Sequence, residues 1–596
     1  MEILEICYEY LLSDLYELGP VYDYVIVGCG TAGSTLALRL SEDKNISVLV
    51  LEAGPRGARW FDIPAVGILL QMSSIDWKYS TVTQTNAAKA FENQVSTWPM
   101  GRIVGGSGRL NNMIYLRGHP DDFRDWFEET EKYNYDYDIL PYFKKSEHHL
   151  GVYKDDGKYH STKGPLVVND LSQTSPLSSA FLEAVQILGY PIGDLNSNRH
   201  TGFMKPQVNI KSGTRWTVAH HLMSISRPNL VLQANTFVEK VLLKSNFEAY
   251  GVAYSYLGRR SQVKVKKGVI LSAGVVGSPK LLMLSGIGPK NHLDEVGLST
   301  KIDLPVGNNL QDHLTTGADL VMLNTSLGVD PFTMFSPITI YNYFLQSSGL
   351  WTTVGCEAIG VISTNVSSHT PDLQFMVIPI GAASDGGKHL SKAVKFTDVS
   401  WKNYFELSIT EKTITASILP VLLRPRSKGT IRLSDKNSRS HPLIDPNYLS
   451  DPYDVRILLK GIELIKKIIK TEPMQRLGAK LNTKKFPGCE NLTIDSQPYW
   501  ECYIRHVTIT SYHPIGTCKM GNKIDNEAVV DYSFRVHGTN KLFVVDASVI
   551  PSAISSNPNA AVAMLGEKAA DEIKYYNYLM ETKCNYVEIL VPKFYC

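Results

Sequence analysis

A glycine-rich turn between two apolar segments is the feature that most restricts how this 596-residue chain can fold. Residues 22–27 (YDYVIV) are apolar enough for a buried parallel strand, and residues 28–33 (GCGTAG) follow at once. The next residues, STLALRLSED, have helical periodicity, and residues 46–51 (ISVLVL) predict a second buried strand. This is a β-α-β unit of about 30 residues with GxGxxG at its first turn, which predicts a Rossmann-like α/β dinucleotide site.

Each glycine of this turn has its own physical reason. Gly28 permits the tight turn, Gly30 lets the backbone approach a pyrophosphate, and Gly33 lets helix and strand pack closely. The diphosphate is then expected at the helix N-terminus beside Thr31 and Ala32, because free N–H groups and the helix dipole favour anions there.

An acidic residue ends the second predicted strand. Glu52, followed by Ala53, lies about 20 residues beyond the last glycine of the turn, where a carboxylate can accept hydrogen bonds from a ribose diol. A carboxylate there repels the extra phosphate of NADP, so the position favours FAD or NAD.

A second glycine-rich segment, residues 101–112 (GRIVGGSGRLNN), distinguishes between these two cofactors. A simple nicotinamide dehydrogenase has no use for it, whereas a flavin needs backbone N–H groups around its pyrophosphate and along its ring edge. The residues expected to contact the flavin nucleotide here are Arg102, Gly105, Gly106, Gly108, Asn111 and Asn112.

Together with five further segments, residues 101–112 resemble the motifs of the glucose–methanol–choline (GMC) family of FAD-dependent oxidoreductases. In chain order the further segments are residues 272–279 (SAGVVGSP) with 281–288 (LLMLSGIG), 307–313 (GNNLQDH), 512–521 (YHPIGTCKMG), 545–548 (VDAS) and 556–560 (SNPNA). The resemblance runs from about residue 23 to about residue 574, which is most of the chain.

The resemblance implies a fold of two interleaved domains, α/β in the first and α+β overall. The FAD-binding domain is expected to comprise residues 20–165, 225–315 and 505–575, and a substrate-binding domain of antiparallel sheet and helices residues 166–224 and 316–504. Residues 1–19 and 576–596 are then terminal extensions. Within the second domain, strand-like patterns occur at 319–323, 372–379 and 408–422, and an amphipathic helical pattern at 452–469.

The chemistry implied by the resemblance is the oxidation of a CH–OH group to a carbonyl. Hydride leaves carbon for flavin N5, and the hydroxyl proton must pass to a base. By resemblance His513 is this base, and histidine suits the role because its ordinary pKa is about 6.5. Asn557 matches the second group, a donor to the substrate oxygen that carries no titratable charge.

Further cofactor contacts are implied at strand ends and near the C-terminal motif. The residues are Val238, Ala273, Gly274, Asp546, Ala547, Pro558 and Asn559. Some choline-oxidising relatives attach FAD through a histidine at the position of Leu110. Leucine cannot form that bond, so the FAD is expected to be non-covalent.

Several alternatives remain open at this point. Cyanohydrin (hydroxynitrile) lyases share the fold and its histidine segment, and a sugar or choline-type dehydrogenase is a further alternative. The electron acceptor is oxygen or a quinone. The aromatic-rich residues 331–351 favour a small apolar or aromatic alcohol, including a cyanohydrin, if they line a pocket or lid, although ordinary packing is the favoured interpretation.

Composition excludes other classes. Sixty basic and 58 acidic residues give a net charge of +2, which argues against a nucleic-acid binder. No run reaches the roughly 18 apolar residues of a membrane span. The sequence has no CxxC and no HExxH, so no metal site is expected; Cys489 and Cys502, or Cys584 and Cys596, could pair. The N-terminus lacks the features of a signal peptide and predicts a short amphipathic helix, while secretion and oligomeric state stay open.

Overall fold

The predicted β-α-β unit is present in the computed structural model, which describes residues 18–590 except 128–129, 330, 366, 389 and 411–412. It consists of β1 (Val21–Val27), α2 (Thr31–Leu40) and β2 (Val48–Leu51). β1 and β2 pair in parallel, and all four residues of β2 are buried. Strands covered on both faces need the continuous apolar sequence that these two segments have.

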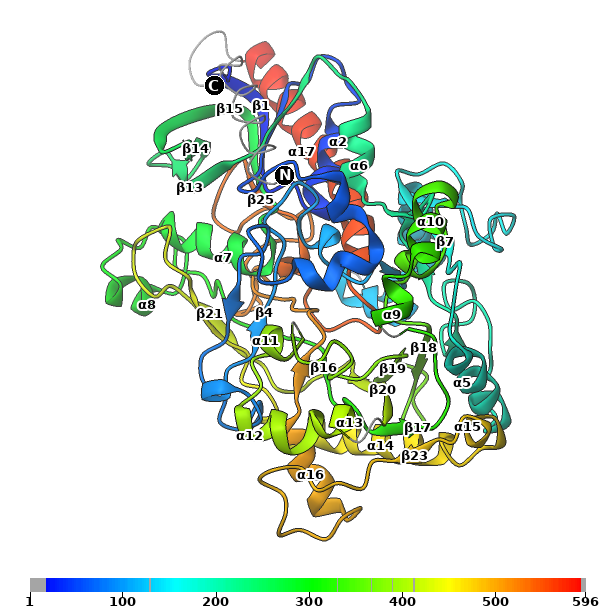
Figure 1. Cartoon of the computed structure of the whole chain (residues 1–596). Helices are drawn as coiled ribbons and strands as arrows, with labels where there is room; N and C mark the ends of the chain where they lie inside the picture. The colour runs from blue at the N-terminus through cyan, green and yellow to red at the C-terminus, as the bar shows by residue number, and fades with distance from the viewer. Residues whose placement is uncertain are drawn as a thin grey trace.

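A seven-stranded sheet grows from this unit in the described residues (Figure 1). Its order is β12 (Leu230–Gln233), β2, β1, β15 (Arg259–Leu271), β14 (Ala249–Tyr256) and β13 (Thr236–Leu243), with β25 (Leu542–Val544) paired to the C-terminal end of β15. β12, β2, β1, β15 and β25 are parallel, whereas β13 and β14 are antiparallel. Three distant sequence segments therefore build one sheet, and α17 (Asn559–Leu590) packs beside α2 against it.

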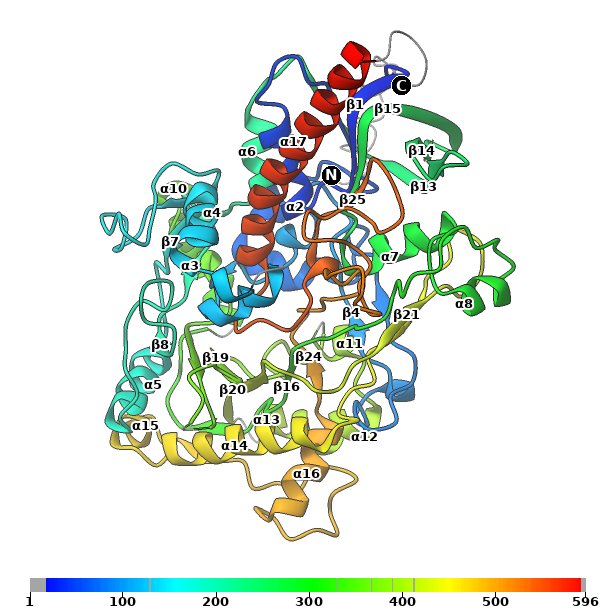
Figure 2. The ribbon, with the colours of Figure 1, turned by 180° about the vertical axis from the view of Figure 1, so that it is seen from behind.

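A second, antiparallel sheet lies at the opposite end of the molecule (Figure 2). Its order is β23 (Lys480–Leu481), β17 (Val321–Leu323), β20 (Ile414–Leu422), β19 (Leu373–Ile378), β18 (Ala358–Ile362) and β8 (Gly202–Met204). β16 (Leu314–Thr315) joins β20 to β24 (Ile509–Thr510), and α14 (Pro452–Ile468) covers β19 and β20. The predicted fold class, a Rossmann-like sheet plus an antiparallel sheet with helices, is confirmed.

Some predicted elements differ in the structure. The strand predicted over residues 408–422 begins only at Ile414, because Leu407–Thr410 form the short helix α13. Apolar alternation alone does not separate one helical turn from a strand. β16 and β24 fall within ranges expected for the FAD-binding domain, yet pair with the second sheet. The division into two domains with the ranges given above is kept as a proposal.

The aromatic-rich residues 331–351 form α9 (Pro331–Met334), α10 (Pro337–Gln346) and the turn η7 (Leu350–Thr352). In α10 the buried side chains are Thr339 and Tyr343, while Ile338 and Phe344 are more than half exposed. Ordinary packing is therefore wrong for much of this helix, which has more apolar side chains than its one contact face can cover.

The two predicted cysteine pairs have different outcomes in the structure. Cys489 and Cys502 form a disulfide with a Cα–Cα distance of 6.0 Å. The other pair includes Cys596, which lies outside the described residues, as does the N-terminal helix expected within residues 1–17. Within the described range, no helix combines the length and apolar character needed to cross a bilayer.

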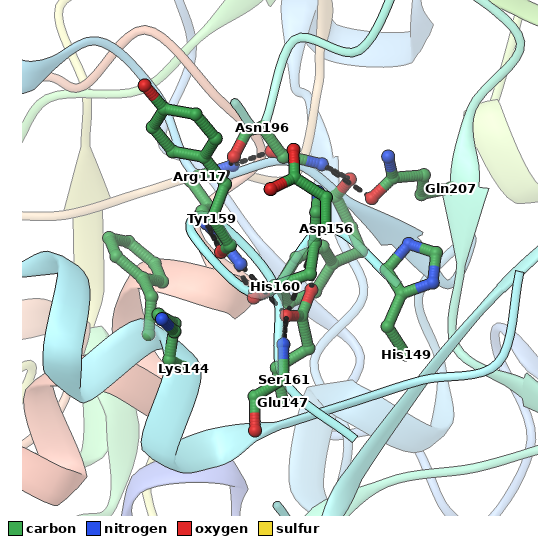
Figure 3. Close-up of polar contacts among 12 residues, drawn as sticks. Arg117, Lys144, Glu147, His149, Asp156, Tyr159, His160, Ser161, Asn196 and Gln207 are labelled. Carbon is green, nitrogen blue, oxygen red and sulfur yellow. Dashed lines mark hydrogen bonds and ion pairs between the residues drawn. The ribbon is translucent and has the colours of Figure 1, made fainter. Parts of the chain in front are cut away.

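A buried network of alternating charge surrounds β6 (Glu147–His149) (Figure 3). Arg117 Nη2 lies 3.0 Å from Glu147 Oε2, His160 Nδ1 lies 3.0 Å from Glu147 Oε1, and His160 Nε2 lies 2.8 Å from Asp194 Oδ2. Burial opposes a charge on His160, but the hydrogen bonds to Asp194 and Glu147 outweigh it and raise its pKa. His160 therefore donates to both carboxylates as an imidazolium.

Glu147, His149 and His160 also converge closely enough to suggest a cation site, with ligand atoms within 4.8 Å of one another. However, His149 Nδ1 accepts a hydrogen bond from the Gly151 N–H (3.1 Å), which leaves the ring proton on Nε2 and no lone pair there for a metal. Arg117 already balances Glu147. The arrangement fits an ion-pair network.

This network predicts a pH dependence of stability. Because the pKa of His160 is raised in the folded state, its contribution is complete below pH 6.5 and is lost as pH rises through the folded pKa. On the acid side, the lowered pKa values of Glu147 and Asp194 mean that stability falls when these carboxylates protonate. Thermal unfolding is measured between about pH 5 and about pH 9. His160→Gln should melt at a lower temperature than the wild type near neutrality, and its melting temperature should fall less than that of the wild type as pH rises. The exposed His369→Gln is the matched control, and an unchanged alkaline decline in His160→Gln would contradict the prediction.

Candidate active site

A cleft lies where the parallel strands end. β1 leads into Gly28, β2 into Glu52, β15 into Ser272 and β25 toward Asp546, and all four residues line it. Ligands of doubly wound α/β sheets bind outside the carboxyl ends of the strands, so this is the expected place for a dinucleotide. The structure brings together every predicted site residue along this cleft except Gly33, Arg102 and Gly105.

Gly33 lies behind the cleft wall, where it has a packing role. A Cβ at this position would meet the Gly28 carbonyl oxygen at 2.0 Å and the Ser272 Cβ at 3.3 Å. Gly28 itself has a φ of +99°, and its own Cβ would meet the Ser272 carbonyl oxygen at 2.4 Å. The turn that presents α2 to the cleft therefore tolerates no side chain at either glycine.

The second glycine-rich segment crosses the first. A Cβ on Gly106 would approach Gly30 Cα at 2.9 Å, so the two loops touch through bare backbone. Gly105 turns behind the wall with a φ of +108°, and Arg109 packs against it and pairs with Asp62 at 2.8 Å. Arg102 likewise does not line the cleft, and its guanidinium lies over the Trp77 ring, 5.4 Å from the centroid.

The polar groups of the cleft match the parts of a flavin dinucleotide. The first turn of α2 carries no acidic side chain, and its amide groups have no partner within the helix. Glu52 accepts hydrogen bonds from the amides of Cys29 (2.8 Å) and Gly54 (2.9 Å), one at each oxygen, so each oxygen keeps a lone pair for a ribose hydroxyl. Burial raises its pKa to about 7, although these backbone bonds act in the opposite direction.

Two further contacts fit the same ligand. A β-bulge interrupts the pairing of β13 between Val238 and Lys240, and a bulge leaves backbone groups outside the ladder at this edge of the cleft. Asp546 accepts from the Gly274 amide at 2.9 Å, and Thr31 donates to Asn559 Oδ1 at 2.7 Å. The last bond ties the glycine-rich turn to the C-terminal motif across the site.

His513 and Asn557 meet at the other end of the cleft. His513 Nε2 lies 3.0 Å from Asn557 Nδ2, and Asn557 Oδ1 accepts from the buried Gln374 Nε2 at 3.1 Å. An amide nitrogen has no lone pair, so Asn557 donates and His513 Nε2 accepts. Burial holds the pKa of His513 well below its ordinary value, with a smaller contribution from His313. His513 is therefore a neutral imidazole whose Nε2 lone pair accepts the hydrogen bond from Asn557 on the cleft wall.

Several lining residues were not predicted from the sequence. They are Gln71, Trp77, Tyr79, Trp98, Met376, Tyr512, Phe237, Lys280 and Ser438. Phe237 and Tyr512 are next in sequence to the predicted residues Val238 and His513, so their place in the cleft could have been inferred. The others belong to no motif. None of the described side chains of residues 331–351 lines the cleft, which removes this segment as a pocket wall.

Leu110 lines the cleft with 5% of its surface exposed. An aliphatic side chain offers no atom for a bond to the flavin. Acid precipitation of the purified holoenzyme should leave the flavin in the supernatant, measured by absorbance and mass spectrometry. A flavin mass retained on the denatured chain would contradict this expectation.

The fold and the cleft are those expected of a dinucleotide-binding protein, and comparison with known proteins shows an FAD-dependent oxidoreductase and gives its family. Two family models, both described as GMC oxidoreductase, match residues 22–315 and 425–566. The chain belongs to the GMC oxidoreductase family, whose members use FAD.

Individual relatives are similar over nearly the whole chain. Glucose dehydrogenase [FAD, quinone] of Drosophila melanogaster is 35% identical over 93% of this chain and 87% of its own length. Alcohol dehydrogenase [acceptor] of Pseudomonas putida is 34% identical over 93% and 96%. The solved structure of pyridoxine 4-oxidase from Mesorbium loti has a TM-score of 0.77 at 29% identity, covering 93% of this chain and 99% of that one.

Proposed function

We propose that this chain oxidises a small apolar or aromatic alcohol to its carbonyl compound at the His513–Asn557 end of the cleft. The observation that carries the proposal is the distance of 3.0 Å between His513 Nε2 and Asn557 Nδ2, both on the cleft wall. A substrate hydroxyl that replaces this direct contact can donate its proton to His513 Nε2 and accept at its oxygen from Asn557 Nδ2, as removal of the proton requires.

The chain's own groups handle the proton and the charge. Bound FAD supplies the two-electron acceptor for the hydrogen on carbon. His513 Nε2 takes the hydroxyl proton, and the low pKa keeps this atom unprotonated at neutral pH. Asn557 Nδ2 donates to the substrate oxygen as negative charge develops, while Gln374 holds the amide in place.

The neighbouring side chains favour an uncharged, apolar substrate. Tyr512 adjoins His513, and Met376 lies two residues beyond Gln374 on β19, so both lie at this end of the cleft. Among the described lining residues the carboxylates are Glu52 and Asp546, which are held by backbone amides of the dinucleotide end. A quaternary ammonium alcohol would gain no ion pair from them, so choline is a weaker candidate.

Anaerobic flavin reduction tests this proposal. The holoenzyme is mixed without oxygen with an aromatic primary alcohol, an aliphatic alcohol, glucose, choline and an aromatic cyanohydrin. Bleaching by the apolar alcohols supports the proposal, and reoxidation by oxygen or by a quinone identifies the acceptor class. Cyanohydrin cleavage without bleaching would instead identify a lyase, and bleaching by glucose or choline alone would overturn the substrate class.

Asn557→Ala should lower turnover while FAD stays bound. Removal of one donor to a developing oxyanion typically costs about 10²–10³-fold in kcat. Stopped-flow flavin reduction measures the effect, and flavin content shows that the cofactor site is intact. The exposed Asn198→Ala is the control. Unchanged turnover in Asn557→Ala would remove this side chain from the reaction.

A further inference from the structure

A second histidine lies against the ring of His513. His313 Nδ1 is 3.1 Å from His513 Nδ1, and the two rings are perpendicular with centroids 5.2 Å apart. His313 is buried and does not line the cleft. Two ring nitrogens can form a hydrogen bond only when one carries a proton and the other a lone pair, so this contact constrains the tautomers of both histidines.

The other contact of the His513 ring decides which of the two histidines donates. Burial, followed by the charge of Arg424, lowers the pKa of His313 to about 4, so the ring is neutral and carries one proton. Hydrogen bonds to the backbone of Ile554 and Leu423 act in the opposite direction. Asn557 Nδ2 can only donate, so His513 Nε2 accepts and the single proton of the neutral His513 ring lies on Nδ1. His313 Nδ1, 3.1 Å away, therefore presents a lone pair to His513.

We propose that His313 is a positioning residue that holds His513 in the tautomer protonated at Nδ1. His513 then donates from Nδ1 to His313 and keeps its Nε2 lone pair in the cleft. The lowered pKa of His313 agrees, because a neutral ring keeps one lone pair with which to accept this hydrogen bond. The role in catalysis rests on the function proposed above, whereas the tautomer itself follows from the hydrogen bonds alone.

The adjacent Asp312 holds the backbone of the same histidine. Asp312 Oδ1 accepts from the His513 amide at 3.1 Å, while Oδ2 accepts from Tyr448 Oη (2.5 Å) and Thr510 Oγ1 (2.6 Å). Burial raises the pKa of Asp312 to about 7. Two consecutive residues therefore hold the backbone and the ring of His513, and of these two only His313 bears on its tautomer.

Loss of the His513 tautomer would change the reaction rate in a different way from a change in the pKa of His513. A neutral His513 protonated at Nε2 cannot accept the substrate proton there, and raising the pH does not exchange one neutral tautomer for the other. Loss of the acceptor at His313 should therefore lower the rate of flavin reduction at every pH. A change in the pKa of His513 alone would shift the acid limb and leave the plateau intact.

Two variants and one spectrum test the proposal. His313→Leu removes the acceptor and should slow flavin reduction at saturating substrate by at least about tenfold, without recovery at high pH and with full flavin content. His313→Asn keeps an acceptor oxygen near the Nδ1 position and should stay within about threefold of the wild type. The ¹⁵N spectrum of histidine-labelled holoenzyme, assigned with His513→Gln, should show His513 protonated at Nδ1.

The outcomes separate this inference from the proposed function. A wild-type rate in His313→Leu, a loss that high pH recovers, or a His513 signal protonated at Nε2 would each overturn it. If no alcohol reduces the flavin, the proposed function fails, yet the spectrum still decides the tautomer. If His313→Leu does not fold, the spectrum and His313→Asn, which should retain the wild-type tautomer, keep the test intact.

Discussion

Replacing His513 by glutamine is expected to slow flavin reduction by about 10²–10⁴-fold, the usual contribution of a positioned general base. The amide fills a similar volume and can bond to Asn557, but it cannot take up the substrate proton. FAD should stay bound, because the dinucleotide contacts lie elsewhere along the cleft. Stopped-flow spectroscopy under anaerobic conditions measures the rate, and the flavin-to-protein absorbance ratio measures occupancy.

The pH dependence gives the same prediction a second readout. The base acts when deprotonated, and burial holds the pKa of His513 well below 6.5. The wild-type rate should therefore be flat through neutrality and fall only as acid protonates this ring, whereas His513→Gln should lack that limb. The exposed His369→Gln should behave as wild type. An acid limb retained in His513→Gln would assign the ionisation to another group, and the two that contact His513 are His313, with a pKa of about 4, and Asp312, with a pKa of about 7.

Adding a single methyl group at Gly33 should largely abolish FAD binding. The new Cβ would lie 2.0 Å from the Gly28 carbonyl oxygen, a backbone atom, and Gly33 is buried within α2, so α2 must move away from β1. Overpacking of this kind typically costs about 1–3 kcal/mol of stability, and here it also displaces the helix N-terminus that faces the diphosphate.

The measurement is the flavin content and melting temperature of purified Gly33→Ala. Gly157→Ala is the matched control, because a Cβ there meets nothing within 4 Å and its φ does not favour glycine. We expect full FAD occupancy in the control and little in Gly33→Ala. A fully loaded Gly33→Ala protein would show that close packing at this turn is dispensable.

The parts of the site that the sequence predicted are those built by neighbouring residues. The turn from β1 to α2 depends on the backbone angles and steric limits of residues 28–33, which are local. His513 and Asn557 were found because family motifs mark them. Trp98, Met376 and Gln374 have no such signal, since each joins the site from a segment whose own pattern shows only burial. The helix α10 shows the limit of local composition, because ordinary packing was the favoured interpretation, yet several of its apolar side chains are exposed and none of the described ones lines the cleft.

By itself, then, the sequence determined the β-α-β unit and its glycine-rich turn, because short-range sterics specify them, and a family motif pointed to His513 as the base proposed above. The tertiary structure alone decided how that base is held. Asn557 lies 44 residues from His513, His313 lies 200 residues from it, and Gln374 lies 183 residues from Asn557. Hydrogen bonds of about 3 Å among such distant residues form only when the folded chain brings their segments together. No local sequence pattern encodes that arrangement, because the geometry of a hydrogen bond depends on the positions of both partners.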